Sequence, residues 1–251
     1  MVAKKHILAK RYGKESKKYE SVRFGTPGGK AIESMEREIV RRLAGNVKNR
    51  KILDVATGTG RFAIDLAKRG ATVYATDLSD KMLQIAKQKA KKSKVKIVFK
   101  KADIEKLPYS DKKFDAVIGI RIIMHLNDYK KALGEMKRVC KEDGYIIFEI
   151  TNKYNIWTLL NNLFRFGIAE ISKTHKKHRA KTYSYSEIKE FLAKNNMFIE
   201  KTYGLFWVPE TLFYKCPKGL LMLILKLENI LRDIMPGYLG ERIFIKAKLI
   251  K

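Results

Sequence analysis

Residues 52–67 place two glycines between two apolar runs that differ in their period. The first run, at 52–55, is mainly apolar and partly β-branched, which predicts a buried strand. The second run, at 61–67, puts apolar side chains on one face of a predicted helix. Gly58 and Gly60 lie between them, where the missing Cβ atoms allow a tight turn and a close approach by a ligand. Free N–H groups at the helix start can meet the anionic end of that ligand, so the segment predicts a cradle for a nucleotide cofactor.

Acidic residues accompany the carboxyl ends of the first three predicted strands. Asp54 lies at the end of the first strand, Asp77 ends the second strand at 71–76, and Asp103 follows the third strand at 95–99. Asp77 comes about 20 residues after the glycine turn, where a carboxylate can accept hydrogen bonds from both hydroxyls of a ribose. Asp103 is suited to accept a hydrogen bond from an adenine amino group. Because parallel strands end at one edge of a sheet, we expect these carboxylates to lie near the glycines.

The glycine spacing alone leaves the cofactor open. Gly58-Thr-Gly60-Arg-Phe-Ala63 also fits the G-x-G-x-x-A pattern of dinucleotide-binding proteins, which is a weak signal by itself. An NAD(P)-dependent oxidoreductase is therefore an alternative. It leaves Asp103 and the following Leu107-Pro108 pair without a role.

Alternating strand and helix patterns continue along the rest of the chain. The core continues with a strand at 114–119, a helix from Glu135 that ends at Gly144, and a strand at 145–150. Before this core we predict a basic lead helix at 4–19, a loop at 25–29 and a helix at 30–43. After it we predict an insertion at 151–182, a helix at 184–196 with a start signal at Ser186, a strand at 197–203, a second insertion at 205–238 and a last strand at 242–250. Without repeats or linkers, this order predicts a single domain with a lead at 1–49 and a core at 50–150.

The order and spacing of these motifs resemble the class I S-adenosylmethionine-dependent methyltransferases, in particular the ubiquinone and menaquinone biosynthesis (type 11) subgroup. The matching motifs are Leu53-Asp54-Val55-Ala56-Thr57-Gly58-Thr59-Gly60, Asp77-Leu78-Ser79 with Met82-Leu83, Asp103 with Leu107-Pro108, Phe114-Asp115, and Gly144. Ala56 stands where many members have a glycine, a small residue that this subgroup often carries. The resemblance implies S-adenosylmethionine as cofactor and an α/β fold with a doubly wound, seven-stranded, mostly parallel sheet and an antiparallel last strand.

The resemblance also implies roles for the matched residues. The glycine turn would line the methionine and ribose parts of the cofactor, Asp77 would hold the ribose hydroxyls, and Asp103 would face the adenine. The implied cofactor-binding residues are Asp54, Ala56, Gly58, Gly60, Asp77, Leu78, Met82, Asp103, Ile104 and Tyr19. Three alternatives stay open: Asp77 and Asp103 as helix N-caps, Met82 as a core residue rather than a neighbour of the adenine ring, and Tyr19, with Tyr12, as surface residues rather than a cover over the cofactor.

The reaction that this cofactor supports is an in-line displacement on the methyl group of a sulfonium, which already carries the positive charge. A base is needed only if the acceptor bears a proton of high pKa. His125 is the candidate base, because it follows the fourth predicted strand in a segment similar to the one near the methyl group in the family. Its alternative role is to cap the next helix with Asn127 and Asp128. Arg121 is a candidate contact for the acceptor or for the cofactor carboxylate.

The two insertions are expected to build the acceptor site, since the core is occupied with the cofactor. Their aromatic and apolar residues are Trp157, Phe164, Phe166, Phe206, Trp207, Leu212, Phe213 and Tyr214. Such a lining favours a small apolar or aromatic acceptor, quinone-like or lipid-like. The alternative is that these residues only cap the core. His175 and His178 have no further ligands near them in the sequence, so we predict a basic loop rather than a metal site.

Composition leaves the choice of partner open. The chain has 251 residues and a net charge of +28, which suits nucleic acid, an anionic membrane surface or a heat-adapted surface. An RNA methyltransferase is the second-ranked function, but Gly119-Ile-Arg-Ile-Ile-Met replaces the Asn/Asp-Pro-Pro-aromatic segment expected for methylation of base amines. Lysines beside the apolar insertions also suit a lipid headgroup surface.

Two cysteines, Cys140 and Cys216, are too few for a disulfide framework or a zinc cluster. We therefore expect inert thiols in a reducing, cytoplasmic setting. The basic, polar start of the chain lacks the apolar stretch of a secretory signal. The late apolar run at 219–225 is too short to span a bilayer, so any membrane contact is expected to be peripheral.

Overall fold

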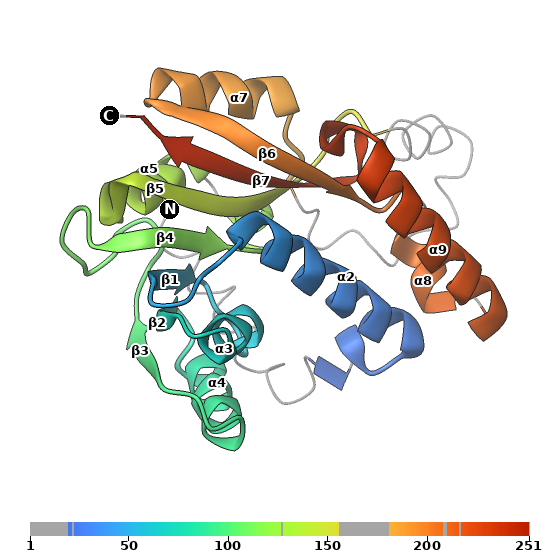
Figure 1. Cartoon of the computed structure of the whole chain (residues 1–251), viewed down its shortest axis with the longest axis horizontal. Coiled ribbons are helices and arrows are strands. Elements are labelled where there is room, and N and C mark those ends of the chain that lie inside the picture. Colours follow the sequence, from blue (N-terminus) through green and yellow to red (C-terminus); the bar gives the residue numbers. More distant parts are fainter. Residues whose placement is uncertain are drawn as a thin grey trace, which may run out of the picture.

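A central seven-stranded sheet organises the computed structural model of this chain, which describes residues 20–21, 23–126, 128–155, 181–207, 210–215 and 217–250 (Figure 1). The strands are β1 (Lys51–Val55), β2 (Thr72–Asp77), β3 (Ile97–Lys101), β4 (Phe114–Gly119), β5 (Cys140–Thr151), β6 (Met197–Leu205) and β7 (Arg242–Leu249). Their order across the sheet is β3-β2-β1-β4-β5-β7-β6. Strands β1 to β5 run parallel, whereas β7 is antiparallel to both β5 and β6. The predicted fold class is confirmed.

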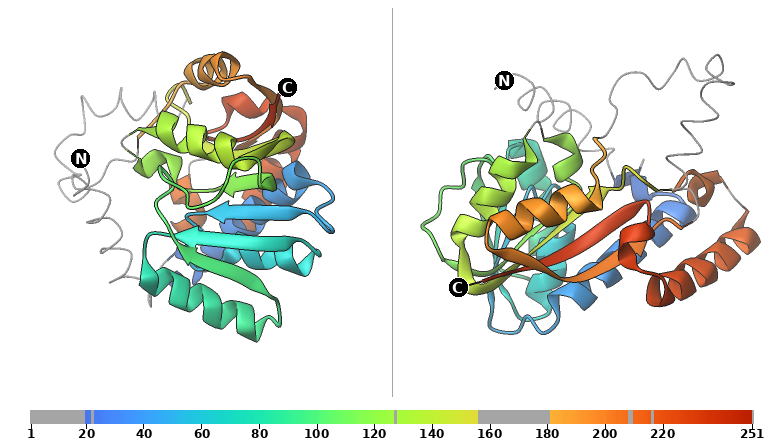
Figure 2. Two further views of the ribbon diagram at one scale, coloured as in Figure 1. Left: turned by 90° about the vertical axis from the view of Figure 1, so that its left-hand side faces the viewer. Right: turned by 90° about the horizontal axis from the view of Figure 1, so that it is seen from above.

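Helices cover both faces of the sheet (Figure 2). The helices are α2 (Pro27–Ala44), α3 (Arg61–Lys68), α4 (Asp80–Lys92), α5 (Tyr129–Val139), α7 (Tyr185–Lys194), α8 (Glu210–Lys215) and α9 (Lys218–Ile234), with short 3-10 helices η1 (Ile123–His125) and η2 (Gly237–Leu239). One buried cluster joins α2, α3, α8 and α9 to the sheet, and a second joins α5 and α7 to its other face. Because both faces are covered, the central strands read as nearly continuous apolar runs.

Helix α2 begins earlier than predicted. The predicted loop at 25–29 is wrong in its second half, because Pro27 is the first residue of the helix. Thr26 caps the helix by accepting a hydrogen bond from the Gly29 backbone N–H at 3.1 Å. A proline at this position suits a helix start, since its missing N–H would have no partner within the helix.

Gly144 does not end a helix as predicted. Helix α5 already ends at Val139, and β5 starts at Cys140, which pairs with Phe114 ahead of a register shift in the strand pair. A Cβ atom at Gly144 would lie 2.6 Å from the Cys140 sulfur and 2.9 Å from the Asp115 carbonyl oxygen. The glycine is therefore required by close packing inside the irregular start of β5.

Smaller differences concern other boundaries. β3 runs two residues later than predicted, at Ile97–Lys101. The start signal of α7 is a capping box formed by Ser184 and Glu187 rather than Ser186. The lead helix at 4–19 and residues 156–180 of the first insertion lie outside the described residues. Within the described residues, no helix combines the length and the apolar character that crossing a bilayer requires.

Gly28 marks the contact between α2 and α8 and gives a test of this packing. A Cβ atom at Gly28 would lie 1.7 Å from the Phe213 carbonyl oxygen, so Gly28→Ala forces α8 to move. We expect the free energy of unfolding to fall by roughly 1–3 kcal/mol in urea denaturation. Gly134→Ala is the control, because a Cβ atom there meets nothing within 4 Å inside α5. It should stabilise by about 0.5–1 kcal/mol, and equal shifts in both variants would contradict this packing.

Candidate functional site

The turn after β1 forms the centre of the site. Ala56, Gly58 and Gly60 all have left-handed backbones, with φ angles of 52°, 55° and 81°. A Cβ atom at Gly60 would lie 3.0 Å from the Ala86 side chain, so this glycine lets α3 start close against α4. Among the residues that the structure describes, nothing lies within 4 Å of a Cβ atom placed at Gly58. The backbone at Gly58 therefore faces open space that a ligand can enter.

Asp54 holds the turn from inside the protein. Its carboxylate accepts hydrogen bonds from the Thr57 hydroxyl at 2.5 Å and from the Ala63 backbone N–H at 3.1 Å. It is almost fully buried, and this burial raises the pKa of Asp54 to about 7. The structure thus places Asp54 beneath the turn, where it fixes the path from β1 into α3. A direct contact with a cofactor stays a prediction.

Asp77 connects the turn to the next strand and helix. One carboxylate oxygen accepts from the Gly58 backbone N–H and the other from the Ser79 backbone N–H, both at 2.8 Å. Burial raises the pKa of Asp77, while these N–H groups act to lower it. The alternative role as a helix N-cap is wrong, because Ser79 caps α4. Leu78 is half-buried between the two residues.

Asp103 lies at the same edge of the sheet, as predicted. Asp77 pairs with Lys101 at the end of β3, and the Ala102 backbone N–H donates to the Asp77 carbonyl oxygen. The Asp103 carboxylate accepts from the Glu105 backbone N–H at 3.0 Å, which closes a local turn rather than capping a helix. Ile104 is buried beside it.

Met82 is buried in the first turn of α4, and its backbone N–H donates to the Ser79 hydroxyl at 3.4 Å. The predicted contacts of Asp103, Ile104 and Met82 with adenine remain predictions. Tyr19, together with Tyr12, lies outside the described residues.

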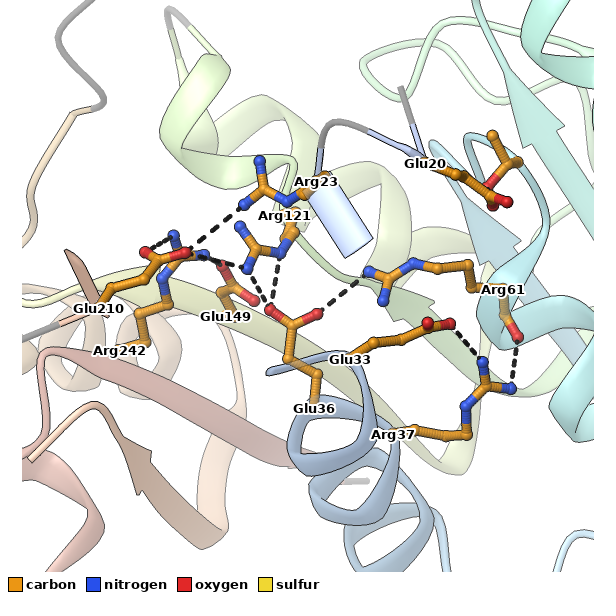
Figure 3. Close-up of polar contacts among 11 residues, drawn as sticks. Glu20, Arg23, Glu33, Glu36, Arg37, Arg61, Arg121, Glu149, Glu210 and Arg242 are labelled. Atoms are coloured by element: carbon orange, nitrogen blue, oxygen red, sulfur yellow. Dashed lines mark hydrogen bonds and ion pairs between the residues drawn. The ribbon is translucent and has the colours of Figure 1, made fainter. Parts of the chain in front are cut away.

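Arg121 is held by acidic residues that the sequence reasoning missed (Figure 3). It follows β4 with a left-handed backbone, φ 61°, and its Nε donates to Glu36 at 2.7 Å. Glu36 is fully buried in α2, and its other oxygen accepts from Arg61 at 3.1 Å. Burial raises the pKa of Glu36 to about 7, against the lowering effect of Arg61. The sequence does contain a signal for Glu36. It lies four residues after Ile32, so it places a charged side chain on the apolar stripe of the predicted helix.

Glu210 of α8 extends this network across the sheet edge. It lies 3.7 Å from Arg121 and 3.9 Å from Arg23, and it accepts from Arg242 at 2.9 Å. Arg242 also donates to the fully buried Glu149 of β5 at 2.7 Å. We call the seven residues the ion cluster: Arg23, Glu36, Arg61, Arg121, Glu149, Glu210 and Arg242. The Glu241 carboxylate also interacts with Arg242, so with all groups ionised four guanidiniums face four carboxylates beside the carboxyl ends of β1, β4 and β5.

Glu20 lies directly over the glycine turn and was also missed. Its carboxylate accepts from the Thr59 hydroxyl at 2.6 Å and forms an ion pair with Lys89 of α4. Burial acts to raise the pKa of Glu20, but the hydrogen bonds from Lys89 and Thr59 leave it lowered. The residue therefore links the start of the described chain to the glycine turn and to α4.

His125 is half-buried at the end of η1, just beyond β4. Its backbone N–H donates to the Ile122 carbonyl oxygen at 2.9 Å. The alternative role as a cap of the next helix belongs to Asp128, whose carboxylate accepts from the Lys130 backbone N–H at 3.0 Å. Asn127 lies outside the described residues. The role of His125 as a base stays a prediction.

The predicted acceptor lining is partly core. Phe206 and Phe213 are fully buried and pack edge to face, with ring centroids 5.6 Å apart, so the alternative that they cap the core holds for them. Trp207 and Tyr214 are half-buried. The positions that lie outside the described chain or its described side chains are Trp157, Phe164, Phe166, His175, His178, Leu212 and Cys216.

The remaining chemistry-bearing groups are few. Burial raises the pKa of the Cys140 thiol to about 12, which makes it unreactive as predicted. No group of three His, Cys, Asp or Glu side chains suited to a metal ion occurs in the part of the chain that the structure describes.

Comparison with known proteins identifies the family to which the central part of the chain belongs. Residues 53–148 match the family described as "Methyltransferase domain". This part of the chain is a methyltransferase domain. It contains the glycine turn, Asp77, Asp103 and His125, so the resemblance drawn from the sequence motifs is confirmed.

The methyltransferase domain is similar to several named proteins. The ubiquinone biosynthesis O-methyltransferase of Pelagibacter ubique is 33% identical over 165 residues, which cover 63% of this chain and 66% of that protein. The demethylmenaquinone methyltransferase of Deinococcus radiodurans is 41% identical over 100 residues, which cover 39% and 42%. The chain matches about two thirds of the length of the Pelagibacter protein and less than half of the Deinococcus protein. In another relative, the matched part is 35% of its length.

One solved structure extends the fold comparison over nearly the whole chain. The magnesium protoporphyrin IX methyltransferase from Synechocystis, crystallised with bound S-adenosylmethionine, has a TM-score of 0.66 and 17% identity. The similarity covers 98% of this chain and 97% of that one. At this identity the match supports the fold alone.

Asp54 provides a pH test of the site. Its pKa is about 7 in the folded protein and 3.8 for an ordinary aspartate, as in the unfolded chain, so folding favours the protonated form. This stabilisation is fully present below about pH 4 and is lost as the pH rises to about 7. We expect the free energy of unfolding of the wild type, relative to Asp54→Asn, to fall by up to roughly 4 kcal/mol over that range. A constant difference between the two proteins from pH 4 to 8 would contradict the burial of Asp54.

Proposed function

We propose that this protein transfers a methyl group from S-adenosylmethionine to a small apolar or aromatic acceptor of quinone-like or lipid-like chemistry. The observation that carries the proposal is the turn at the end of β1, where Gly58 faces open space and Asp77 reaches it from the end of β2. This geometry supports an adenosyl cofactor laid across the carboxyl ends of β1, β2 and β3, as expected for open α/β sheets.

The residues present fit that cofactor. The carboxylate of Asp77 keeps acceptor capacity beyond the two N–H groups that it binds, which suits the hydroxyls of a ribose. Asp103 lies at the same edge, at the end of β3, for the adenine amino group. Arg121, just beyond β4, is the candidate contact for the carboxylate of the methionine part. The match of residues 53–148 to a methyltransferase family supports the assignment.

Methyl transfer requires the protein mainly to position the acceptor against the cofactor. The cofactor supplies an activated methyl group when bound. The chain must hold the acceptor atom about 3–3.5 Å from that methyl group and exclude water. His125, at the end of η1 beyond β4, is our candidate to accept a proton if the acceptor is a hydroxyl.

The names of the relatives support the acceptor class. The Pelagibacter and Deinococcus proteins are named for ubiquinone biosynthesis and for demethylmenaquinone, and both names point to apolar compounds with a quinone ring. In this chain the two insertions follow β5 and β6 in the sequence, and Trp207 and Tyr214 of the second insertion are half-buried aromatic residues that could contact such a ring.

Cofactor binding is tested by calorimetry with S-adenosylhomocysteine, the demethylated product. We expect the wild type to bind it and Asp77→Ala to bind roughly 10- to 100-fold more weakly, because hydrogen bonds to a charged carboxylate are lost.

Asp80→Ala is the matched control for this measurement. Asp80 lies three residues further on, where its exposed carboxylate forms an ion pair with Lys101. Its loss should leave the affinity unchanged. Stabilisation by NAD or NADP instead of S-adenosylhomocysteine in a thermal shift assay would replace the proposed function with an oxidoreductase.

The acceptor class is tested with radiolabelled S-adenosylmethionine. We expect label in a reduced, hydroxyl-bearing short-chain quinone analogue, and about 100-fold slower turnover in His125→Asn with unchanged S-adenosylhomocysteine affinity. An unchanged rate in His125→Asn would show that His125 is not the base, but it would leave the proposed methyl transfer intact. Label in RNA rather than in the quinone would reverse the order of the two candidate substrates.

A further inference from the structure

Helix α9 presents a row of large apolar side chains to solvent. The row consists of Leu220, Leu223, Leu227, Ile230 and Ile234, which are 47%, 63%, 43%, 55% and 71% exposed. Their spacing of three and four residues puts them on one stripe of the helix, about 21 Å long at 1.5 Å per residue. We call these five residues the α9 stripe.

The exposed apolar surface continues beyond the helix. Met235, Tyr238 and Leu239 follow α9 and are 38%, 43% and 45% exposed. Single exposed apolar residues are ordinary, but a contiguous group of this length on a monomer is typical of a site that contacts a partner or a membrane.

A second apolar face fastens α9 to the protein. Leu221 and Ile224 are buried in the cluster that covers the sheet, and Leu225 packs against it. Glu228 is buried on the same side, where it accepts a hydrogen bond from the Phe206 backbone N–H at 3.2 Å. The α9 stripe is therefore carried by an anchored helix at the outer flank of the molecule, beside α2 (Figure 1).

Charge favours an anionic surface over a second copy of this chain. Lys226 of α9 is exposed, and the carboxylate of Asp233, near the end of the helix, is paired with both Arg42 and Arg232. The whole chain carries a net charge of +28. Two such molecules repel each other, whereas an acidic lipid surface attracts them.

We propose that α9 docks the protein on an anionic lipid bilayer, lying in the plane of the interface with the α9 stripe inserted at the boundary between headgroups and acyl chains. A helix that combines an apolar stripe with a net basic protein binds in this manner through buried apolar area and through attraction to acidic lipids. The docking is independent of methyl transfer, and its test uses no cofactor.

The position of α9 also relates this surface to the candidate site. Helix α8 directly precedes α9 and carries Glu210 of the ion cluster. An acceptor dissolved in the bilayer would therefore leave it close to the sheet edge where we expect the methyl group. This consequence, unlike the docking itself, rests on the proposed function.

The test is flotation of the full chain with vesicles of phosphatidylcholine alone or mixed with phosphatidylglycerol. We expect flotation only with the acidic lipid, weakened as ionic strength rises. Leu223→Glu should raise the lipid concentration for half-binding roughly tenfold or more, since it places a charge in the stripe. Val98→Glu is the matched control, because Val98 is a 51% exposed residue of edge strand β3, far from α9 in the fold. It adds the same charge and should leave binding unchanged.

Two further readouts keep the result interpretable. Thermal denaturation should give similar midpoints for Leu223→Glu and the wild type, because the anchoring face of α9 is untouched. Ile230→Trp should show a blue-shifted emission with acidic vesicles. Absence of flotation by the wild type, or equal loss in Leu223→Glu and Val98→Glu, would overturn the proposal. Dimers that Leu223→Glu converts to monomers, without any flotation, would assign the stripe to a second copy instead.

Discussion

The carboxylate of Asp77 joins the two chain segments that make the candidate site. By accepting from Gly58 and from Ser79, it fixes the glycine turn after β1 against the start of α4 after β2. Asp54 fixes the same turn from below through Thr57 and Ala63. Two carboxylates thus hold a loop whose three left-handed residues would otherwise be free to adopt many conformations. The open space beside Gly58 follows from that restraint.

The ion cluster has a different function in the fold. It joins α2, α3, β5, α8 and β7 at the edge where the sheet would meet its ligands. Buried ion pairs add little net stability, but removal of one partner leaves an unbalanced buried charge, so they specify how elements dock. Here they hold the side chain of Arg121, a residue with a left-handed backbone conformation, next to β4. The result is a network of paired charges beside the glycine turn.

The proposed methyl transfer and the proposed membrane docking both depend on helices α8 and α9. Helices α8 and α9 continue the chain after β6, and their buried faces complete the core that α2 begins. The same two helices supply Glu210 to the site and the α9 stripe to the surface. An enzyme for apolar acceptors gains from this arrangement, because the acceptor partitions into lipid and the site is then presented to it from the membrane side. The +28 charge of the chain, which the methyltransferase domain alone does not explain, fits the same arrangement.

Local patterns in the sequence determined the succession of strands and helices in the cofactor half, the glycine turn and the positions of Asp77 and Asp103, because each depends on residues close together along the chain. Boundaries such as those of α2 and β5 were misjudged, since capping by Thr26 and the packing of Gly144 against Cys140 compete with simple periodicity. Only the tertiary structure decided which residues that are far apart in the sequence lie close together in space. Glu36, Glu149 and Glu210 are far apart in sequence, and only the packing of α2 and α8 against β5 and β7 brings their charges to one place. It likewise decided that one apolar face of α9 is buried while the other meets solvent, because a helix that is apolar over most of its circumference gives no sign of which side the core will take.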